Sequence, residues 1–186
     1  VVVLNPNNGE ILALVSHPAF DPNIFAGGIS QQNWVNLISN RIKPLQNRAI
    51  QGQYSPGSAF KIVTATAGLE SGIIAPSTTF YCPGYFYFGG RPFHCWRERG
   101  HGLVDIHRAL TESCNVFFYN VGARLGIDRI AKYASLYGLG NPLGITLGNE
   151  KSGIAPSSIW KKKTLGQKWY PGETISVAIG QGYTSV

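Results

Sequence analysis

Residues 55–72 read SPGSAFKIVTATAGLESG, and this stretch predicts the central helix of the fold. The Ser-Pro-Gly-Ser cluster at its start is typical of a turn, and the apolar side chains that follow recur at helical spacing. Gly72 is a natural C-terminal stop for such a helix. Ser58 is therefore expected in the first turn of a buried helix.

Ser58 and Lys61 form an S-x-x-K pattern at the start of this helix. Positions i and i+3 lie on one face of a helix, so Lys61 can reach the Ser58 oxygen. A serine hydroxyl becomes a nucleophile when a base lies within hydrogen-bonding reach. Burial among apolar side chains lowers a lysine pKa towards the range of a general base. The alternative interpretation is that Ser58 is only a helix N-cap.

The same spacing occurs again at Ser158 and Lys161. Residues 161–168 read KKKTLGQK, so we expect Lys161 to stay hydrated and charged. The apolar helix after Ser58 should instead bury Lys61. The contrast in environment favours Ser58 as the reactive serine.

A second candidate element, Ser113-Cys114-Asn115, lies 55 residues after Ser58 at an expected corner between two helices. The Ser113 hydroxyl can relay a proton, and the Asn115 amide can orient a substrate backbone. The alternative is an ordinary capping pair before the next helix.

The rest of the chain predicts a mixed fold. Two β-type runs, residues 1–4 and 11–16, flank an Asn-Gly pair that is a strong hairpin signal. Residues 73–104 are dense in Gly, Pro and aromatic residues and are expected to form a long loop or irregular hairpin. Helices are expected at residues 31–39, 105–110, 116–125 and 128–138, and from about residue 174. Asp105 is the expected N-cap of the second of these helices. The fold class is therefore α+β, with helices packed on a sheet.

The composition is that of a globular domain. The 186 residues are 44% hydrophobic and 13% charged, against about 25% charged in average soluble domains, which excludes a disordered tail or a coiled coil. The net charge of +7 invites a nucleic-acid partner. Yet the basic residues are dispersed apart from residues 161–163, and no nucleic-acid-binding motif accompanies them. We expect no nucleic-acid partner, because a surface that faces an anionic lipid or polymer explains the excess of positive charge equally well.

The three cysteines fall in one part of the chain, at Cys82, Cys95 and Cys114, with His101 among them. Three thiols and one imidazole would complete a tetrahedral Zn²⁺ site, which makes a structural zinc ion the candidate metal. His101 is preferred over His94 because its Gly-His-Gly setting leaves room for a metal. The alternative is a Cys82–Cys95 disulfide with Cys114 buried as a small apolar residue. No cofactor is expected for catalysis.

Three strings strongly resemble penicillin-binding proteins: NRAIQGQYSPGSAFKIVTA, ALTESCNVFFYNVGARLG and PGETISVAIGQGYTSV. S-x-x-K belongs to the motif set of that family and of class A β-lactamases. The opening VVVLNPNNGEILALVSHPAFDPN looks like the first transpeptidase strands of class B members. ESCNVFFYNVG and WYPGETISVAIGQGY resemble most closely the elongation type, penicillin-binding protein 2.

This resemblance implies a D,D-transpeptidase that acts on peptidoglycan stem peptides ending in D-Ala-D-Ala, cross-links the wall during elongation and is acylated by β-lactams. Ser58 would be the acylated nucleophile and Lys61 its general base. Ser113 would relay the proton to the leaving D-Ala, and Asn115 would hold the substrate or the β-lactam side chain. Some elongation-type relatives place metal-binding side chains in the loop equivalent to the cysteine-rich one.

The implied fold is the penicillin-binding transpeptidase or serine β-lactamase-like fold, a sheet flanked by helices. The family's third motif, K-[ST]-G, is expected downstream of the IGQG segment, and Lys163-Thr164-Leu165 is not a substitute because it lacks the glycine. We expect residues 1–186 to be the N-terminal and central part of a transpeptidase domain, with a membrane anchor and C-terminal strands outside it. Alone, this part is expected to be a poor or inactive enzyme. The family also implies a periplasmic domain of a single-pass inner-membrane protein, with a membrane glycan polymerase as partner.

Two rival functions stay open. The first is a β-lactamase or penicillin sensor of the same fold, although no Glu lies in an obvious deacylating loop. The second is a non-enzymatic, zinc-pinned module that binds wall polymer.

Overall fold

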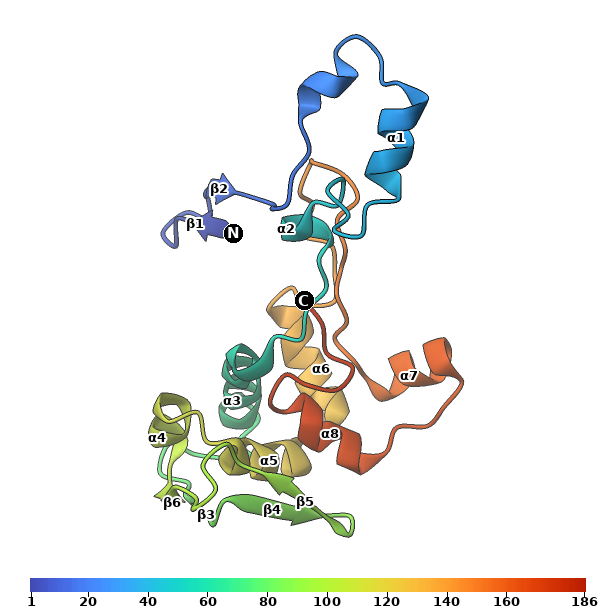
Figure 1. Ribbon diagram of the computed structural model, residues 1–186. Helices are drawn as coiled ribbons and strands as arrows, with labels where there is room; N and C mark the ends of the chain where they lie inside the picture. Colours follow the sequence, from blue (N-terminus) through green and yellow to red (C-terminus); the bar gives the residue numbers. More distant parts are fainter. The chain divides into compact units, whose positions relative to one another are not determined.

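The computed structural model describes residues 1–186 and divides them into two compact units (Figure 1). The first unit comprises Val1–Gly52 and Gly144–Lys151, and the second comprises Gln53–Leu143 and Ser152–Val186. No helix combines the length and the apolar character needed to cross a bilayer. The assignment of all 186 residues to one part of a transpeptidase domain stays a prediction.

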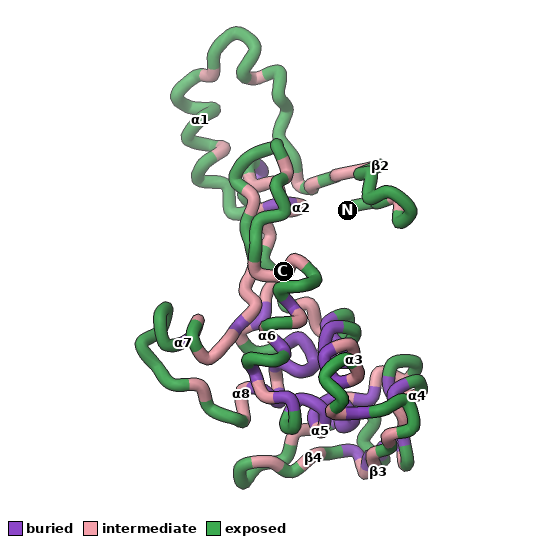
Figure 2. Tube along the Cα trace, turned by 180° about the vertical axis from the view of Figure 1, so that it is seen from behind, coloured by how far each residue is buried: buried purple, intermediate pink, exposed green.

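The first unit has little buried surface. Strands β1 (Val2–Leu4) and β2 (Ile11–Leu14) form the predicted antiparallel hairpin, with Val2 opposite Leu14. The remaining elements of the unit are the 3₁₀ helix η1 (Pro22–Phe25) and the α-helices α1 (Gln31–Ile38) and α2 (Arg48–Gln51). Only Pro44 and Ile50 are buried, so the tube in Figure 2 is mostly green over these residues.

The second unit contains the hydrophobic core. A 3₁₀ turn, η2 (Gly57–Phe60), runs directly into α3 (Lys61–Glu70), close to where the sequence predicts the central helix. The other helices of this unit are α4 (Ile106–Thr111), α5 (Asn115–Leu125), α6 (Ile127–Leu136), α7 (Ser158–Leu165) and α8 (Pro171–Val177). Asp105 caps α4 as expected, because its carboxylate accepts a hydrogen bond from the Arg108 N–H at 2.8 Å.

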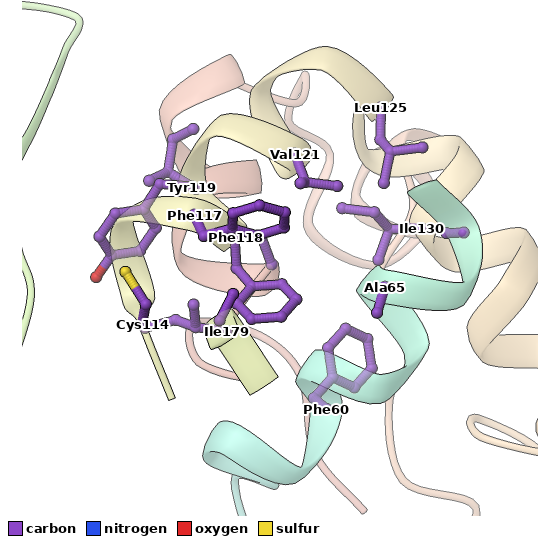
Figure 3. Close-up of a cluster of buried hydrophobic side chains, with 14 of the residues drawn as sticks. Phe60, Ala65, Cys114, Phe117, Phe118, Tyr119, Val121, Leu125, Ile130 and Ile179 are labelled. Atoms are coloured by element: carbon purple, nitrogen blue, oxygen red, sulfur yellow. The ribbon is translucent and has the colours of Figure 1, made fainter. Parts of the chain in front are cut away.

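Helix α5 is the centre of this core. Its sequence NVFFYNVGARL is apolar on most sides, and such a helix packs in an interior rather than on a surface. It contacts α3, α6 and α8, and Figure 3 shows Ala65 of α3, Val121 of α5 and Ile130 of α6 in one cluster. A Cβ on Gly122 would lie 2.5 Å from the Cβ of Ala178, so a glycine is needed where α5 meets the residue that follows α8.

Residues 73–104, expected as a loop or irregular hairpin, contain two antiparallel ladders. Strand β3 (Phe80–Cys82) pairs with β6 (Gly102–Val104), and β4 (Tyr85–Phe88) pairs with β5 (Arg91–His94). The YFYF sequence of β4 alternates between exposed and half-buried positions. Because both faces are aromatic, the two-residue period is invisible in the hydropathy pattern. The α+β prediction is confirmed, with the described strands in three two-stranded ladders.

The prediction that Lys161 stays hydrated is wrong. Only 1% of the residue is exposed, because α7 turns it inward, where its amine pairs with the Glu173 carboxylate. Its Nζ also lies 4.8 to 5.7 Å from the ring centres of Trp169, Tyr170 and Tyr183. Three consecutive lysines look uniformly exposed in the sequence, but consecutive positions of a helix point in different directions, so one of them can face the protein.

Candidate active site

The turn that carries Ser58 is held in place by the segment after α8. Gly57 donates its N–H to the Gly180 carbonyl at 3.0 Å, and the Ser55 hydroxyl donates to the same oxygen. One turn further along α3, the Thr64 hydroxyl donates to the Ala178 carbonyl at 2.9 Å. Ser58 is therefore fixed by a distant part of the chain as well as by its own helix.

Three of the four predicted catalytic side chains meet in a chain of short hydrogen bonds, and the fourth flanks it. The Ser113 hydroxyl donates to Ser58 Oγ at 3.0 Å, and Lys61 Nζ donates to Ser113 Oγ at 2.9 Å. Lys61 Nζ also donates to the Ser113 carbonyl at 2.8 Å and to Asn115 Oδ1 at 2.7 Å. The amine thus reaches Ser58 through Ser113 rather than directly.

The amine of Lys61 is buried among neutral partners. Only 1% of the residue is exposed, and its three hydrogen-bond acceptors are a carbonyl, a hydroxyl and an amide oxygen. Burial lowers the pKa of Lys61 from 10.5 to about 8, although the nearby Cys95 and Cys114 act in the opposite direction. A substantial share of the amine is therefore neutral near physiological pH, as a general base requires.

Ser113 has an unusual backbone. It lies at the predicted corner between α4 and α5, and its φ of 52° is in the left-handed region that a non-glycine residue rarely adopts. Strained backbone of this kind is concentrated at functional sites, where the surrounding structure holds it. The conformation allows both oxygens of Ser113 to accept from Lys61.

A cavity of about 430 Å³ opens beside these residues. Its lining consists of Ser58, Ser113 and Asn115 together with Trp96, Ile179 and Gln181. The last three were not singled out as site residues, because nothing in their local sequence distinguishes them from packing or surface residues. The cavity places open space directly next to the candidate nucleophile.

The predicted metal ligands also come together. One ligand atom from each of Cys82, Cys95, His101 and Cys114 lies within 4.8 Å of all the others, and the four residues are buried. His101 Nδ1 is 3.6 Å from the Sγ atoms of both Cys82 and Cys95. All three cysteines are free, so the alternative Cys82–Cys95 disulfide is not present. Soft thiolates and an imidazole are a donor set that suits zinc.

Two glycines allow the loops around this cluster to close tightly. A Cβ on Gly84 would lie 2.0 Å from the Glu98 carbonyl oxygen, and a Cβ on Gly100 would lie 2.0 Å from that of Cys82. Both residues also have positive φ angles. No other residue type fits these positions, which bring Cys82, Cys95 and His101 together.

The electrostatics of the cluster also fit metal binding. A hydrogen bond from the Cys114 thiol holds the pKa of Cys95 well below its usual value, so Cys95 is ready to act as a thiolate. On the other side of the buried His101 ring, Nε2 lies 3.8 Å from a Glu112 carboxylate oxygen. A carboxylate behind a ligating imidazole is the usual outer partner in metal sites.

One protein-family model and several curated relatives match nearly the whole chain. The protein-family model described as "Penicillin binding protein transpeptidase domain" matches residues 1–186. The peptidoglycan D,D-transpeptidase MrdA of Acinetobacter baumannii is 43% identical over 184 residues, which are 98% of this chain and 27% of MrdA. Curated MrdA relatives are matched over less than a third of their length.

Solved structures give the same result. The complex of penicillin-binding protein PBP2 with MreC from Helicobacter pylori superposes with a TM-score of 0.93 at 36% identity, covering 99% of this chain and 35% of that one. A structure described as a peptidoglycan synthase complex that coordinates polymerization and crosslinking superposes with a TM-score of 0.88 at 43% identity, covering 99% of this chain and 32% of that one.

Proposed function

Because the chain belongs to the penicillin-binding protein transpeptidase family, we propose that it carries the acyl-transfer site of a peptidoglycan D,D-transpeptidase. The observation that carries this proposal is the hydrogen-bonded series Lys61–Ser113–Ser58 beside an open cavity. A nucleophile linked to a buried amine of lowered pKa is what serine acyl transfer requires.

In the proposed reaction, Ser58 Oγ attacks the carbonyl carbon of the penultimate D-Ala in a stem peptide. The Ser58 proton passes to the Ser113 oxygen as Ser113 gives its own to neutral Lys61, which accords with the distances of 3.0 and 2.9 Å. The C–N bond to the terminal D-Ala breaks, and Lys61 returns a proton through Ser113 to the leaving amine. An amine of a neighbouring strand then attacks the ester, and the C–O bond to Ser58 breaks. The proton that the amine loses passes through Lys61 and Ser113 to Ser58 Oγ, which completes the cross-link.

The first test is the substitution Ser58→Ala in the full-length protein, measured by labelling with fluorescent penicillin. A β-lactam reacts through the same step: its amide C–N bond breaks as the Ser58 ester forms, and the proton moves to the nitrogen. We expect labelling to be lost, whereas Ser158→Ala, the serine of the second S-x-x-K pattern, labels normally. Labelling of the Ser58→Ala protein would refute the assignment.

The same experiment separates the transpeptidase from a β-lactamase. A lasting one-to-one adduct supports the transpeptidase, because a hydrolase needs a positioned water that clears the ester. Rapid turnover of penicillin would support the β-lactamase instead.

We further propose that Cys82, Cys95, His101 and Cys114 bind one structural Zn²⁺. The ion would join the β3–β6 and β4–β5 region to the start of α5, because Cys114 lies between Ser113 and Asn115. Zinc analysis of the purified protein should find one ion per chain. His101→Ala should lose it, whereas the exposed His94→Ala should retain it.

Chelation tests the link between this cluster and acyl transfer. We expect removal of zinc to lower the melting temperature and to slow penicillin labelling, with a zinc-saturated chelator as control. Absence of stoichiometric zinc, together with two cysteines that resist thiol reagents, would reject the metal site in favour of a disulfide.

Two of the similar structures support partners in cell-wall synthesis. H. pylori PBP2 was solved with MreC, and another similar structure couples polymerization to crosslinking. We propose that the full-length protein works in the periplasm beside a membrane glycan polymerase, anchored in the inner membrane. Co-purification of the polymerase with the tagged full-length protein tests this assembly.

A further inference from the structure

Trp96 donates two hydrogen bonds that have no role in the reaction proposed above. Its indole N–H points at two main-chain carbonyls, Glu112 O at 3.0 Å and Ser113 O at 3.1 Å. These carbonyls belong to the peptide groups on either side of the Ser113 Cα. One donor therefore spans the backbone of a single residue.

That residue is the one with the left-handed backbone. Ser113 has a φ of 52° although it carries a side chain, so its conformation has to be held by its surroundings. Two donors act on its carbonyl, Lys61 Nζ at 2.8 Å and the Trp96 indole at 3.1 Å. Because the indole also binds the preceding carbonyl, it restrains the rotation that would relax Ser113 into an ordinary conformation.

Packing does not explain the position of Trp96. The residue is 62% exposed, and its ring touches the edge of His101 with ring centres 5.3 Å apart. It follows Cys95 directly and borders the cavity that contains Ser58. A large apolar ring left open to solvent at such a site is more readily explained by its N–H group than by burial.

We infer that Trp96 is a positioning residue for acyl transfer: its indole N–H holds Ser113 in the left-handed conformation that aligns the Ser113 hydroxyl between Lys61 and Ser58. This inference rests on the proposed function of Ser58. It assigns Trp96 no contact with the reacting atoms. Loss of the N–H alone should therefore slow the acylation step while leaving the affinity for the β-lactam nearly unchanged.

The sharpest test removes only the donor. Replacement of Trp96 by 3-benzothienylalanine in the full-length protein keeps the bicyclic ring and exchanges the N–H for sulfur, and Trp96→Phe keeps an aromatic ring without the donor. Stopped-flow acylation with fluorescent penicillin separates the acylation rate constant from the apparent dissociation constant. We expect the rate constant to fall about tenfold in both variants and the dissociation constant to stay within about twofold.

Trp34→Phe is the matched control, because Trp34 lies on α1 in the other unit and makes none of these contacts. An unchanged rate constant in the benzothienyl variant would overturn the inference, and so would a rise in the dissociation constant alone, which would make Trp96 only a wall of the cavity. The Ser58→Ala protein is measured in parallel. If it labels, the proposed function fails; if it does not label while the Trp96 variants react at the normal rate, only this inference fails.

Discussion

The chain contains two S-x-x-K lysines, and both are buried to the same extent. Lys61 and Lys161 each have 1% of their surface exposed, yet their chemistry differs. The three hydrogen-bond acceptors of Lys61 are neutral, and burial lowers its pKa to about 8. Burial acts on Lys161 in the same direction, but the hydrogen bond and charge of Glu173 outweigh it and raise its pKa.

The comparison shows that burial alone does not make a base. A buried amine beside a carboxylate stays protonated and acts as a structural cation, here enclosed by three aromatic rings. A buried amine whose partners are a carbonyl, a hydroxyl and an amide can lose its proton. The absence of a carboxylate among the hydrogen-bond partners of Lys61 is therefore the feature that suits it to catalysis.

The largest change in the acylation rate should come from removing the amine of Lys61. Lys61→Met in the full-length protein should reduce the penicillin acylation rate constant about 10³-fold, because the serine loses its general base. Lys161→Met is the matched change at the second site, and the folded protein should react within about twofold of the normal rate. Similar losses in both variants would remove the distinction between the two lysines.

The next substitution gives Lys61 the partner that Lys161 has. Asn115→Asp places a carboxylate where the amide oxygen now lies, 2.7 Å from Lys61 Nζ. An opposite charge at this range should raise the pKa of Lys61 by about one to three units and slow acylation at pH 7 about 100-fold.

A pH profile distinguishes this effect from loss of a substrate contact. Acylation by the Asn115→Asp protein should recover at alkaline pH, with a midpoint above that of the unmodified protein. Asn141→Asp, an exposed asparagine of the same unit, should leave the profile in place. A uniformly slow variant with an unshifted midpoint would show that Asn115 acts only on the substrate.

In the unmodified protein, the lowered pKa of Lys61 should produce a smaller change in the acylation rate, which depends on pH. Lys61 has to be neutral to accept a proton, and it loses its own proton as the pH rises through about 8. The acylation rate constant should therefore increase about tenfold per unit from about pH 6 and level off above about pH 8. A rate that is flat across this range would contradict a lysine base.

The smallest effect on acylation is expected at the second lysine. Glu173→Gln leaves the Lys161 charge among aromatic rings without its carboxylate, which should lower the melting temperature by several degrees. The acylation rate constant of the folded protein should stay within about twofold. Calorimetry and penicillin labelling on the same sample measure both quantities. An unchanged melting temperature would show that the aromatic rings alone stabilise the charge of Lys161.

Local signals explain which elements could be predicted. The β1–β2 hairpin follows from its Asn-Gly turn, and α4 follows from the Asp105 cap, because each signal acts within a few residues. The burial of Lys161 could not be predicted, since it depends on Glu173 and on rings beyond α7. The β3–β6 pair likewise forms between segments about twenty residues apart.

In the candidate site, too, some residues could be predicted from the sequence and others could not. The motifs indicated Ser58, Lys61, Ser113 and Asn115 as a set, and the structure adds that the amine reaches Ser58 through Ser113. Trp96 could not be found, because a single tryptophan after a cysteine has no pattern of its own. Its relation to the carbonyls of Glu112 and Ser113 exists only in three dimensions.

The carbonyl of Gly180 has a consequence for the order of assembly. Ser55 and Gly57, in the turn before Ser58, donate hydrogen bonds to the Gly180 carbonyl oxygen, which lies 125 positions after Ser55. During synthesis, a growing chain contains Ser58 long before it contains the Gly180 carbonyl that accepts hydrogen bonds from the preceding turn. A nascent polypeptide that ends before Gly180 therefore contains the S-x-x-K motif but lacks the acceptor for the Ser55 hydroxyl and the Gly57 N–H.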